Sequence, residues 1–464
     1  MIPLSLAQVA DVVGGALLSD DPRGPTVRHV TIDSREAGPG SLFVPLEGSQ
    51  ADGHDFVADA LARGAAGYLC AEARCARGPL ADAPSGAVVV DDPADALLGL
   101  GAWLREEVDP VVVTLTGSQG KTTTKDLIAA AVGPARRVVA NRGSYNNELG
   151  VPLTCTELEA DSEVLVSEIG ARGVGHIAPL AALLRADVAI VTAVSAAHLE
   201  LLGDLETVAR AKAELVEALE PDAVAILNAD DPRVAAMAGR TRARVVTYGL
   251  EAEADWRARD IVIDGQARPR FRAEGPHGHT EIALPLPGRH NVGNALAALA
   301  AAQACGVDPA AAAAGLADAR VSRWRMELAR RDDGTSVLND AYNANPASTA
   351  AALEALVALD ARRRWAVLGL MAELGAGSEE AHREVGRACA AHGLDGVLVV
   401  GEAAPIAEGA RQAGFGGVLE EVADAEEAGA RLAALLGPGD AVLVKASRSV
   451  GLEGLAADLL EPRR

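Results

Sequence analysis

Residues 111–124 read Val-Val-Val-Thr-Leu-Thr-Gly-Ser-Gln-Gly-Lys-Thr-Thr-Thr, an apolar run followed by a glycine turn and a polar, helix-like start. A strand, a glycine turn and a helix in this order are the setting that a phosphate-binding loop requires. Gly117 and Gly120 would let backbone N–H groups approach phosphate oxygens, and the N-terminus of a helix favours anions. Lys121 would reach the outer phosphates, and Thr122 would ligate Mg²⁺. The stretch therefore predicts a nucleotide-binding α/β domain.

The loop is shorter than the common GxxxxGK[ST] pattern, because only Ser118 and Gln119 separate its two glycines. A glycine turn that binds nothing is the alternative, but the lysine and threonine stand at the right positions after a strand-like run. No Asn in the chain is followed by Lys, so the guanine-reading NKxD motif is missing and ATP is the predicted nucleotide. The predicted loop contacts to ATP are Thr116, Gly117, Ser118, Gln119, Gly120, Lys121, Thr122 and Thr123.

Strand-like runs alternate with helix-like stretches on both sides of a boundary that we place near Arg320. This alternation predicts parallel sheets covered by helices. An Ala-rich helix at 291–304 and a further helical stretch to residue 316 would lie between the two sheets. The predicted strands are 111–115, 164–166, 188–194 and 224–227 before the boundary, and 336–338, 365–370, 396–400 and 441–444 after it.

The first hundred residues have a different pattern, with short strands expected at 27–32, 42–45 and 88–90 between Gly, Pro and Asp turns. A length of 464 residues fits three domains at about 150 residues each. We therefore predict an α/β protein of three domains. These are a small α/β domain at 1–107, a central P-loop ATPase-like domain with a parallel sheet at 108–320, and a Rossmann-like α/β domain at 321–464.

Charge and composition exclude several partners. The formal net charge of −23 repels nucleic acid and anionic membranes, so neither is expected to bind. The sequence shows no signal-peptide pattern and no run of about 20 apolar residues. Five cysteines without a CxxC pair fit reduced thiols, and we take Cys70 and Cys75 as bystanders. We expect a cytoplasmic monomer without membrane insertion.

Lysine is rare: Lys121, Lys125, Lys212 and Lys445 are the only lysines among 42 basic residues. Where arginine supplies almost every cation, a remaining lysine suggests a need for a compact or titratable amine. The alternative is that any single lysine was retained by chance, without a functional need for it.

Two residues near strand ends carry groups that suit a metal ion. Glu168 ends a strand-like run, and a carboxylate is a hard oxygen ligand of the kind that Mg²⁺ prefers. His198 closes the next strand-like run, although a histidine there, taken alone, would more often be structural.

Motifs along essentially the whole chain resemble those of the Mur ligase family. The central-domain motifs occur in the family's order, and chance does not supply so many in sequence. They are TGSQGKT at 116–122, NRGSYNNELGVP at 141–152, SEIG at 167–170, AHLE at 197–200, AKAE at 211–214, NADD at 228–231 and GRHNVGNA at 288–295.

The resemblance implies roles for residues of the central domain. Glu168 and His198 would hold magnesium, and Lys212 would carry a carbamate that supports a second ion. A partly buried amine can become uncharged and capture CO₂, whereas a surface lysine on a helix is the alternative. Asn291 and Asn294 would face the adenine of ATP.

In the third domain, the resemblance implies that Asp340 faces the ribose and Arg325 the γ-phosphate. A cation there would offset the charge on the transferred phosphoryl group. The catalytic residues implied in this way are Lys121, His198, Lys212 and Arg325.

The N-terminal motifs TIDSRE at 31–36, PGSLFVPLEG at 39–48 and DGHDF at 52–56 look like those of the family's uridine-nucleotide domain. Ser34 and Arg35 would face the diphosphate, although Ser-Arg alone would usually mean only a turn.

Motifs of the third domain imply the substrates. NDAYNANPAS at 339–348, GLMAELG at 369–375 and VKASRS at 444–449 are similar to those of members that add D-alanyl-D-alanine to UDP-N-acetylmuramoyl-tripeptide. ATP would convert a peptide carboxylate into an acyl phosphate, which the dipeptide amine then attacks. The implied substrate contacts, beyond Ser34 and Arg35, are Asn146, Asn147, Asn343, Lys445, Ser447 and Arg448.

Other functions remain as alternatives. One is another amino-acid-adding member or a folylpolyglutamate relative, although the DNPR motif of the diaminopimelate-adding members is missing from the third domain. A regulatory ATP-binding module would leave the predicted magnesium ligands unused. A dehydrogenase would need a G-x-G-x-x-G run after the strands of the third domain, and none is present there.

Overall fold

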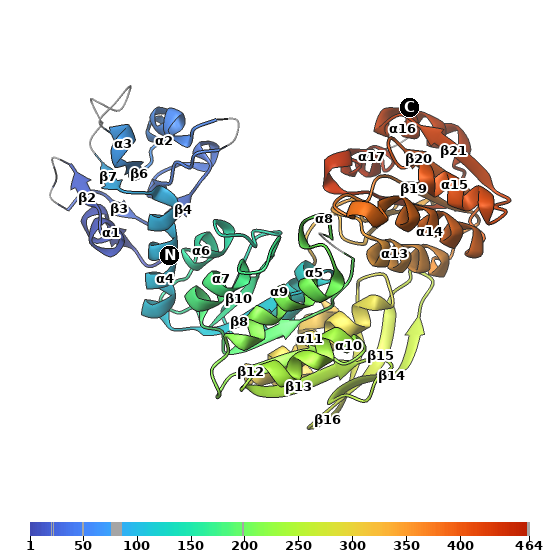
Figure 1. The fold of residues 1–464 in the computed structure, drawn as a ribbon, viewed down its shortest axis with the longest axis horizontal. Helices are drawn as coiled ribbons and strands as arrows, with labels where there is room; N and C mark the ends of the chain where they lie inside the picture. Colours follow the sequence, from blue (N-terminus) through green and yellow to red (C-terminus); the bar gives the residue numbers. More distant parts are fainter. Residues whose placement is uncertain (20, 22, 49–50, 76–85, 197–198, 462–464) are drawn as a thin grey trace. The chain divides into compact units, whose positions relative to one another are not determined.

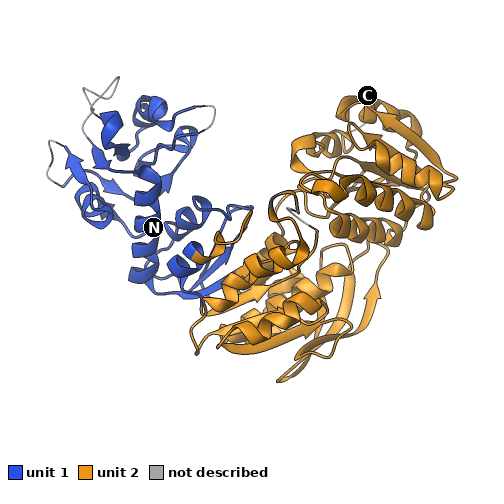
Figure 2. Ribbon diagram, viewed as in Figure 1, with its two compact units in different colours: residues 1–114, 136–170, 179–186 blue, residues 115–135, 171–178, 187–464 orange. Residues whose placement is uncertain are grey.

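The computed structural model describes residues 1–19, 21, 23–48, 51–75, 86–196 and 199–461. These residues form helices packed on β-sheets, as the sequence pattern predicted (Figure 1). They group into two compact units (Figure 2): unit 1 holds residues 1–114, 136–170 and 179–186, and unit 2 holds 115–135, 171–178 and 187–464. The domain boundaries at residues 107 and 320 remain predictions.

Unit 1 begins with a five-stranded sheet whose two faces both bury apolar side chains. On β6, Leu69 packs into one cluster while Tyr68 and Cys70 pack into the other, because alternate residues of a strand point to opposite faces. β2 pairs antiparallel with β7, and the other pairs are parallel. The strand order is β2(Ala16–Leu18), β7(Ala87–Val90), β6(Gly67–Ala71), β5(Ser41–Phe43), β4(His29–Thr31).

Helices cover both faces of this sheet. Leu6 of α1 and Leu97 of α4 belong to one cluster, and Val57 of α2 belongs to the other. Asp92 caps α4 by accepting from the N–H groups of Ala94 and Asp95. The remaining elements here are β1(Leu4–Ser5) paired with β3(Thr26–Val27), α1(Leu6–Val13), α2(Val57–Ala62), α3(Glu72–Cys75) and α4(Pro93–Val108).

One sequence-based expectation is wrong in this region. Cys70 and Cys75 are joined by a disulfide, not present as two reduced thiols. The chain leaves β6 and turns at once into α3, which brings the two Cα atoms to 6.1 Å. A spacing of five residues does not reveal such a turn, so the sequence did not indicate the pair.

The central sheet has nine strands. The pair of β11 with β12 joins two predicted strands and is parallel, as predicted. The pairs of β12 with β13, β13 with β14 and β9 with β10 are also parallel, although β9, β13 and β14 were not predicted as strands. β15 pairs antiparallel with both β14 and β16, and the predicted βα alternation did not include these antiparallel pairs. The order is β16(Gly278–Ala283), β15(Pro269–Gly275), β14(Trp256–Ile263), β13(Arg244–Gly249), β12(Val224–Asn228), β11(Val188–Val191), β8(Val111–Thr116), β10(Val164–Glu168), β9(Val138–Ala140).

Helices connect these strands. The predicted Ala-rich helices are confirmed as α11 and α12, and both pack against α5. The helices are α5(Lys121–Val132), α6(Gly150–Cys155), α7(Ile177–Leu184), α8(Leu199–Leu202), α9(Leu205–Glu217), α10(Pro232–Ala235), α11(His290–Ala304) and α12(Pro309–Ala317).

The last sheet has six strands and confirms the predicted set after residue 320. β17 is antiparallel to β18, and the remaining pairs are parallel. On β22, Leu443 packs towards α13, α14 and α15, and Val444 packs towards α16 and α17. The order is β17(Glu327–Arg330), β18(Ser336–Asn339), β22(Ala441–Lys445), β19(Arg364–Leu368), β20(Gly396–Val400), β21(Val418–Val422). The helices are α13(Pro346–Ala358), α14(Ser378–Ala391), α15(Ala404–Gln412), α16(Ala425–Leu435) and α17(Glu453–Asp458).

Among the described residues, no helix combines the length and apolar character needed to cross a membrane.

Two glycines allow α14 and α15 to pack backbone to backbone. A Cβ on Gly386 would lie 1.9 Å from the carbonyl oxygen of Ile406, and a Cβ on Gly409 would lie 2.1 Å from that of Arg383. Both distances are far below van der Waals contact, and backbone atoms cannot move aside as a side chain can. The close approach of the two helices therefore depends on both glycines.

We expect Gly386→Ala to lower the free energy of unfolding by about 1–3 kcal/mol, because the helices must separate to admit a methyl group. Gly454→Ala is the matched control, since Gly454 of α17 is exposed and a Cβ there meets no atom within 4 Å. Calorimetric melting of both variants measures the effect. Equal melting temperatures for Gly386→Ala and wild type would contradict the packing argument.

Candidate active site

The predicted phosphate loop joins the end of β8 to the start of α5. Gly120 stands before the first turn of α5 in the left-handed region with φ 77°, and Gly117 has φ 152°. A Cβ on Gly117 would lie 2.0 Å from the Thr192 hydroxyl oxygen. Only glycine fits at residue 117, because both the backbone conformation and the neighbour exclude a side chain.

Thr192 follows β11 directly and holds the loop. Its N–H donates to the Thr116 carbonyl at 3.0 Å, and its hydroxyl donates to the Gln119 carbonyl at 2.6 Å. The side-chain amide of Asn228 in turn donates to the Thr192 carbonyl at 2.8 Å. Sequence reasoning missed Thr192. Thr192 comes directly after a buried strand, and ligands of parallel sheets bind at the carboxyl ends of the strands. This position is the signal in the sequence that could have pointed to Thr192.

Further contacts shape the loop from within. The Nζ of Lys121 donates to the Gly117 carbonyl at 2.8 Å, across the turn. The Ser118 hydroxyl donates to the carbonyl of Ser195 at 3.1 Å and accepts from its N–H at 3.0 Å. Thr122 is buried in the first turn of α5. Contacts within the protein therefore hold the loop in its conformation.

The two asparagines predicted to face adenine lie beside this loop. The Asn294 side chain accepts from the Thr124 hydroxyl at 3.2 Å and donates to the Asn291 side-chain oxygen at 2.9 Å. The Asn291 amide donates to the Pro287 carbonyl at 2.7 Å. A Cβ on Gly120 would lie 2.9 Å from the Asn294 oxygen. The structure therefore brings the start of α11 against the start of α5.

Glu168 ends β10 as predicted, with its carboxylate buried. One of its oxygens accepts from the Asn146 amide at 2.6 Å, and its N–H donates to the Asn141 side-chain oxygen at 2.9 Å. Asn146, predicted to contact substrate, therefore orients Glu168, and Asn141 is a buried partner that sequence reasoning missed. The Asn147 side chain accepts from the Gly150 N–H at 2.9 Å, at the start of α6.

The structure gives different information on the other two predicted metal ligands, His198 and Lys212. His198 lies outside the described residues. Lys212 is only 2% exposed on α9, so the surface-lysine alternative is wrong. Within the described ranges, no cluster of three or more His, Cys, Asp or Glu side chains suits a metal ion.

Several predicted residues of the C-terminal region meet around Lys445, which is buried at the end of β22. Its Nζ donates to the Asp340 carboxylate at 2.5 Å and to the Asn343 carbonyl at 2.8 Å. The other Asp340 oxygen accepts from the Met326 N–H at 3.0 Å. Asp340 is therefore held by both of its oxygens.

Arg325 lies between two residues in the left-handed region, Trp324 with φ 61° and Met326 with φ 53°. Its guanidinium lies over the Tyr342 ring at 4.0 Å. The guanidinium of Arg448 lies over the Trp324 ring at 4.3 Å. Non-glycine residues rarely adopt this backbone conformation, and such strain is common at functional sites.

His290 is the first residue of α11, and the charges of Asp340 and Lys445 act on its pKa. Burial lowers the pKa of His290 to about 4, while Asp340 acts to raise that pKa and Lys445 to lower it. Its Nδ1 is enclosed and has no hydrogen-bond partner among the described residues. The ring is therefore neutral near pH 7, a property that the motif alone did not indicate.

Ser34 and Arg35 form a short 3-10 turn capped by Asp33. The Arg35 guanidinium donates to both Asp33 oxygens, at 2.6 to 3.1 Å, and its side chain is 83% exposed. The hydrogen bond from Arg35 holds the pKa of the Asp33 carboxyl below its usual value. The role of this turn in binding a diphosphate remains a prediction.

The loop 369–375 is held from two sides. The Met371 N–H donates to Nε2 of His382 at 2.8 Å, and the Ala372 N–H donates to the Ser447 hydroxyl at 2.8 Å. Nδ1 of His382 lies 2.7 Å from the Ser378 carbonyl, so Nδ1 carries the proton of the neutral ring. Burial lowers the pKa of His382.

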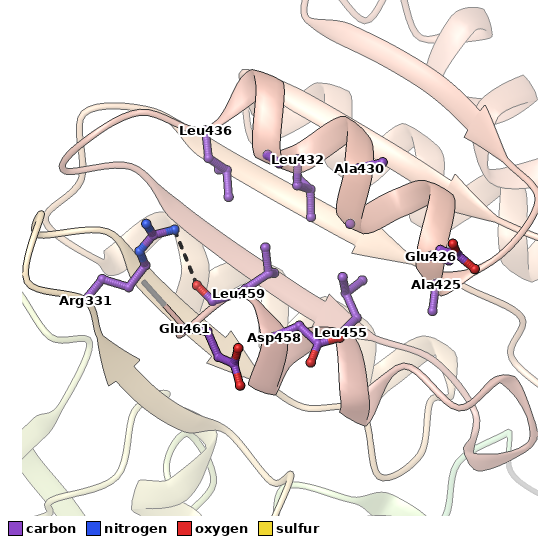
Figure 3. A pocket seen from close by; sticks show the side chains of 12 residues that line it. Arg331, Ala425, Glu426, Ala430, Leu432, Leu436, Leu455, Asp458, Leu459 and Glu461 are labelled. Carbon is purple, nitrogen blue, oxygen red and sulfur yellow. Dashed lines mark hydrogen bonds between the residues drawn. The ribbon is translucent and has the colours of Figure 1, made fainter. Parts of the chain in front are cut away.

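A cavity of about 360 Å³ lies apart from these residues, between α16 and α17 (Figure 3). Leu432 and Leu436 line one side, and Leu455 and Leu459 line the other. The Arg331 guanidinium donates to the Leu459 carbonyl at 3.4 Å at one end. No predicted site residue lines this cavity.

A parallel sheet with a glycine loop and a buried threonine at the head of the following helix defines a phosphate-loop nucleotide-binding protein. Comparison with known proteins narrows this class. Three family models match: "Mur ligase family, catalytic domain" at residues 26–100, "Mur ligase middle domain" at 115–302 and "Mur ligase, glutamate ligase domain" at 324–448.

Similar proteins agree with these models. The UDP-N-acetylmuramoyl-tripeptide--D-alanyl-D-alanine ligase of Mycobacterium tuberculosis is 40% identical over 99% of this chain and 98% of its own length. A crystal structure of MurF from Acinetobacter baumannii has a TM-score of 0.87 at 31% identity, covering 99% of both chains. The MurF ligase from Thermotoga maritima in complex with ADP has a TM-score of 0.78 at 28% identity, covering 93% of this chain and 99% of its own. This chain belongs to the Mur ligase family of ATP-dependent ligases.

The buried ring of His382 makes stability depend on pH. In the unfolded chain, histidine takes up a proton near pH 6.5, whereas the folded ring does so only at lower pH. The contribution of His382 is therefore complete above about pH 6.5 and is lost as the pH falls below it. We expect His382→Gln, which can still accept from Met371 but does not titrate, to lose less stability than wild type between about pH 7 and pH 5.

Urea unfolding across this pH range measures the difference. His279→Gln, which changes an exposed histidine on β16, should keep the pH slope of the wild type. Parallel curves for wild type and His382→Gln would refute the role of the buried ring.

Proposed function

We propose that this chain joins D-alanyl-D-alanine to UDP-N-acetylmuramoyl-tripeptide and converts ATP to ADP and phosphate through an acyl-phosphate intermediate. The observation that carries this proposal is the 40% identity, over 99% of the chain, to a relative named for that activity. Two features of the structure support the proposal. The phosphate loop would serve to bind ATP, and the cluster around Lys445 would serve to bind the amine substrate. Since the reaction consumes ATP, we place it in the cytoplasm. A monomer remains a prediction.

The reaction proceeds in two steps. A carboxylate is a poor acylating agent, because an oxide would have to leave. A peptide carboxylate oxygen therefore bonds to the γ-phosphorus of ATP, the bond from that phosphorus to the bridging oxygen breaks, and ADP leaves. The dipeptide amine nitrogen then bonds to the acyl carbon, the carbon–oxygen bond to phosphate breaks, and the amine gives up a proton.

The residues contribute position and charge to these steps. Lys121 and the backbone N–H groups of the loop would hold the β- and γ-phosphates, and Arg325 would offset charge on the transferred group. Asn291 and Asn294 would face adenine, and Asp340 would accept from the ribose. Asp340 is already held by Lys445 and Met326, so its orientation is set before ATP binds.

We assign magnesium to Glu168 and Thr122, each of which offers a hard oxygen donor. The Glu168 carboxylate is buried at a strand end with its orientation set by Asn146, and the Thr122 hydroxyl stands in the first turn of α5. Both are hard oxygen donors of the kind that Mg²⁺ prefers. Magnesium, when bound, would neutralise phosphate charge. We assign His198 and a carbamate on Lys212 to the same role.

The substrate contacts follow the family motifs. Ser34 and Arg35 would meet the diphosphate of the uridine nucleotide, as expected from their exposed turn. Asn147 would contact the nucleotide-peptide, and Asn146 would act through Glu168. The amine substrate would meet Asn343, Lys445, Ser447 and Arg448.

Phosphate release tests the substrate assignment. With ATP and UDP-N-acetylmuramoyl-tripeptide present, we expect D-alanyl-D-alanine to support turnover. Single amino acids, including glutamate, should not support it. Lys121→Ala should abolish turnover with its melting temperature unchanged, because Lys121 contacts developing charge and is not part of the core. Faster release with a different amine would replace the proposed substrate, and an active Lys121→Ala would remove the loop from the mechanism.

The proposed carbamate gives Lys212 a distinctive response. We expect Lys212→Ala to be inactive and to recover part of its rate with added short-chain carboxylates, which can supply the missing anionic oxygen. Lys212→Arg should stay inactive at every carboxylate concentration, since guanidinium does not take up CO₂. An Arg variant with the wild-type rate would rule out the carbamate.

A further inference from the structure

The chain between α12 and β17 runs along the phosphate-loop helix α5. A Cβ on Gly315 of α12 would lie 2.0 Å from the Ala130 carbonyl oxygen, so α12 and α5 are in direct backbone contact. Further along the chain, the Ser322 N–H donates to the Asp126 carboxylate at 2.7 Å. Asp126 and Ala130 are four residues apart and share one face of α5. From Gly315 to Ser322, the chain therefore advances along α5 towards the phosphate loop.

The distances along α5 bring the next residues close to that loop. Asp126 lies five residues after Lys121, which is about 7.5 Å along a helix axis. Arg325 lies three residues after Ser322, and three extended residues span at most about 10 Å. A chain anchored at Asp126 can therefore present Arg325 at the phosphate end of α5.

The other side of this segment is held by the C-terminal region. Tyr342 donates its N–H to the Trp324 carbonyl at 3.2 Å, and the Met326 N–H donates to Asp340 at 3.0 Å. Trp324 and Met326 both have positive φ. Arg325 thus stands on a short strained stretch with one anchor at Asp126 and the other at Asp340 and Tyr342.

Asp126 is well placed to act as a fixed anchor. Its side chain is 12% exposed, and its other oxygen pairs with Lys125 at 2.9 Å. Lys125 is buried, with a side-chain exposure of 3%. A carboxylate with one charged partner and one backbone donor has little freedom to turn.

We propose that Asp126 is a positioning residue that latches residues 322–326 to α5, so that Arg325 meets the γ-phosphate. This inference rests on the proposed function, since it uses the role assigned to Arg325. In this proposal Asp126 does not itself contact ATP or the peptide. Its effect on the rate acts through Arg325.

Steady-state phosphate release by the full chain tests the latch. Asp126→Ala should lower kcat about tenfold, because a hydrogen bond to a charged group is lost, while the Kd for ADP stays at the wild-type value. Asp126→Asn keeps an oxygen acceptor and should stay within about twofold of the wild-type kcat. A wild-type kcat for Asp126→Ala would overturn the proposal.

A second pair of variants changes the donor without altering α5. Ser322→Pro removes the N–H and should match Asp126→Ala, whereas Ser322→Ala keeps the N–H and should behave as wild type. In an Arg325→Ala background, Asp126→Ala should cause no further loss, because its effect passes through Arg325. Additive losses would mean a general structural role and would overturn the proposal.

Hydrogen–deuterium exchange separates this inference from the proposed function. Peptides covering residues 318–326 should exchange faster in Asp126→Ala than in wild type, whichever amine is the substrate. Unchanged exchange overturns the latch even if the substrates are as proposed. Faster exchange together with failure of every tested amine would leave the latch standing and remove the proposed function.

Discussion

The close contact between Gly117 and Thr192 is the constraint on which the rest of unit 2 depends. With 2.0 Å between a would-be Cβ and the Thr192 hydroxyl, the loop can fold only around glycine. The same threonine holds Thr116 and Gln119, so the end of β11 determines the loop's path. From the loop, contacts continue through Thr124 to Asn294, and through Asp126 to Ser322. One strand end thus organises α5, α11 and the segment that carries Arg325.

Buried charge organises the C-terminal region in a similar way. Lys445 is 2% exposed, and its ammonium is matched by Asp340 and by backbone carbonyls. Removing one partner of such a pair leaves an uncompensated buried charge, which costs about 3–5 kcal/mol. Because the Asp340 carboxylate also accepts from Met326, the geometry of residues 324–326 depends on the same pair.

The rarity of lysine was an informative signal. Lys125, Lys212 and Lys445 are each 2% exposed, although lysine is usually a surface residue. Lys121 lies on the phosphate loop, where its Nζ reaches the Gly117 carbonyl. In a chain that supplies most of its cations as arginine, three of the four lysines are therefore buried.

The sequence by itself determined the phosphate loop, the strands on which it depends and the family, because these follow from local patterns of apolar residues, glycines and short motifs. It also indicated Glu168 at a strand end, since the end of a strand can be read from the chain. Only the tertiary structure decided which residues form three hydrogen bonds. Asn146 donates to Glu168, Thr192 donates to the Gln119 carbonyl of the loop, and the Ser322 N–H donates to Asp126. The partners in these contacts are 22, 73 and 196 residues apart. Packing brings them together over separations at which a sequence pattern carries no distance information, and the turn that joins Cys70 to Cys75 escaped prediction because its backbone path has no local signal.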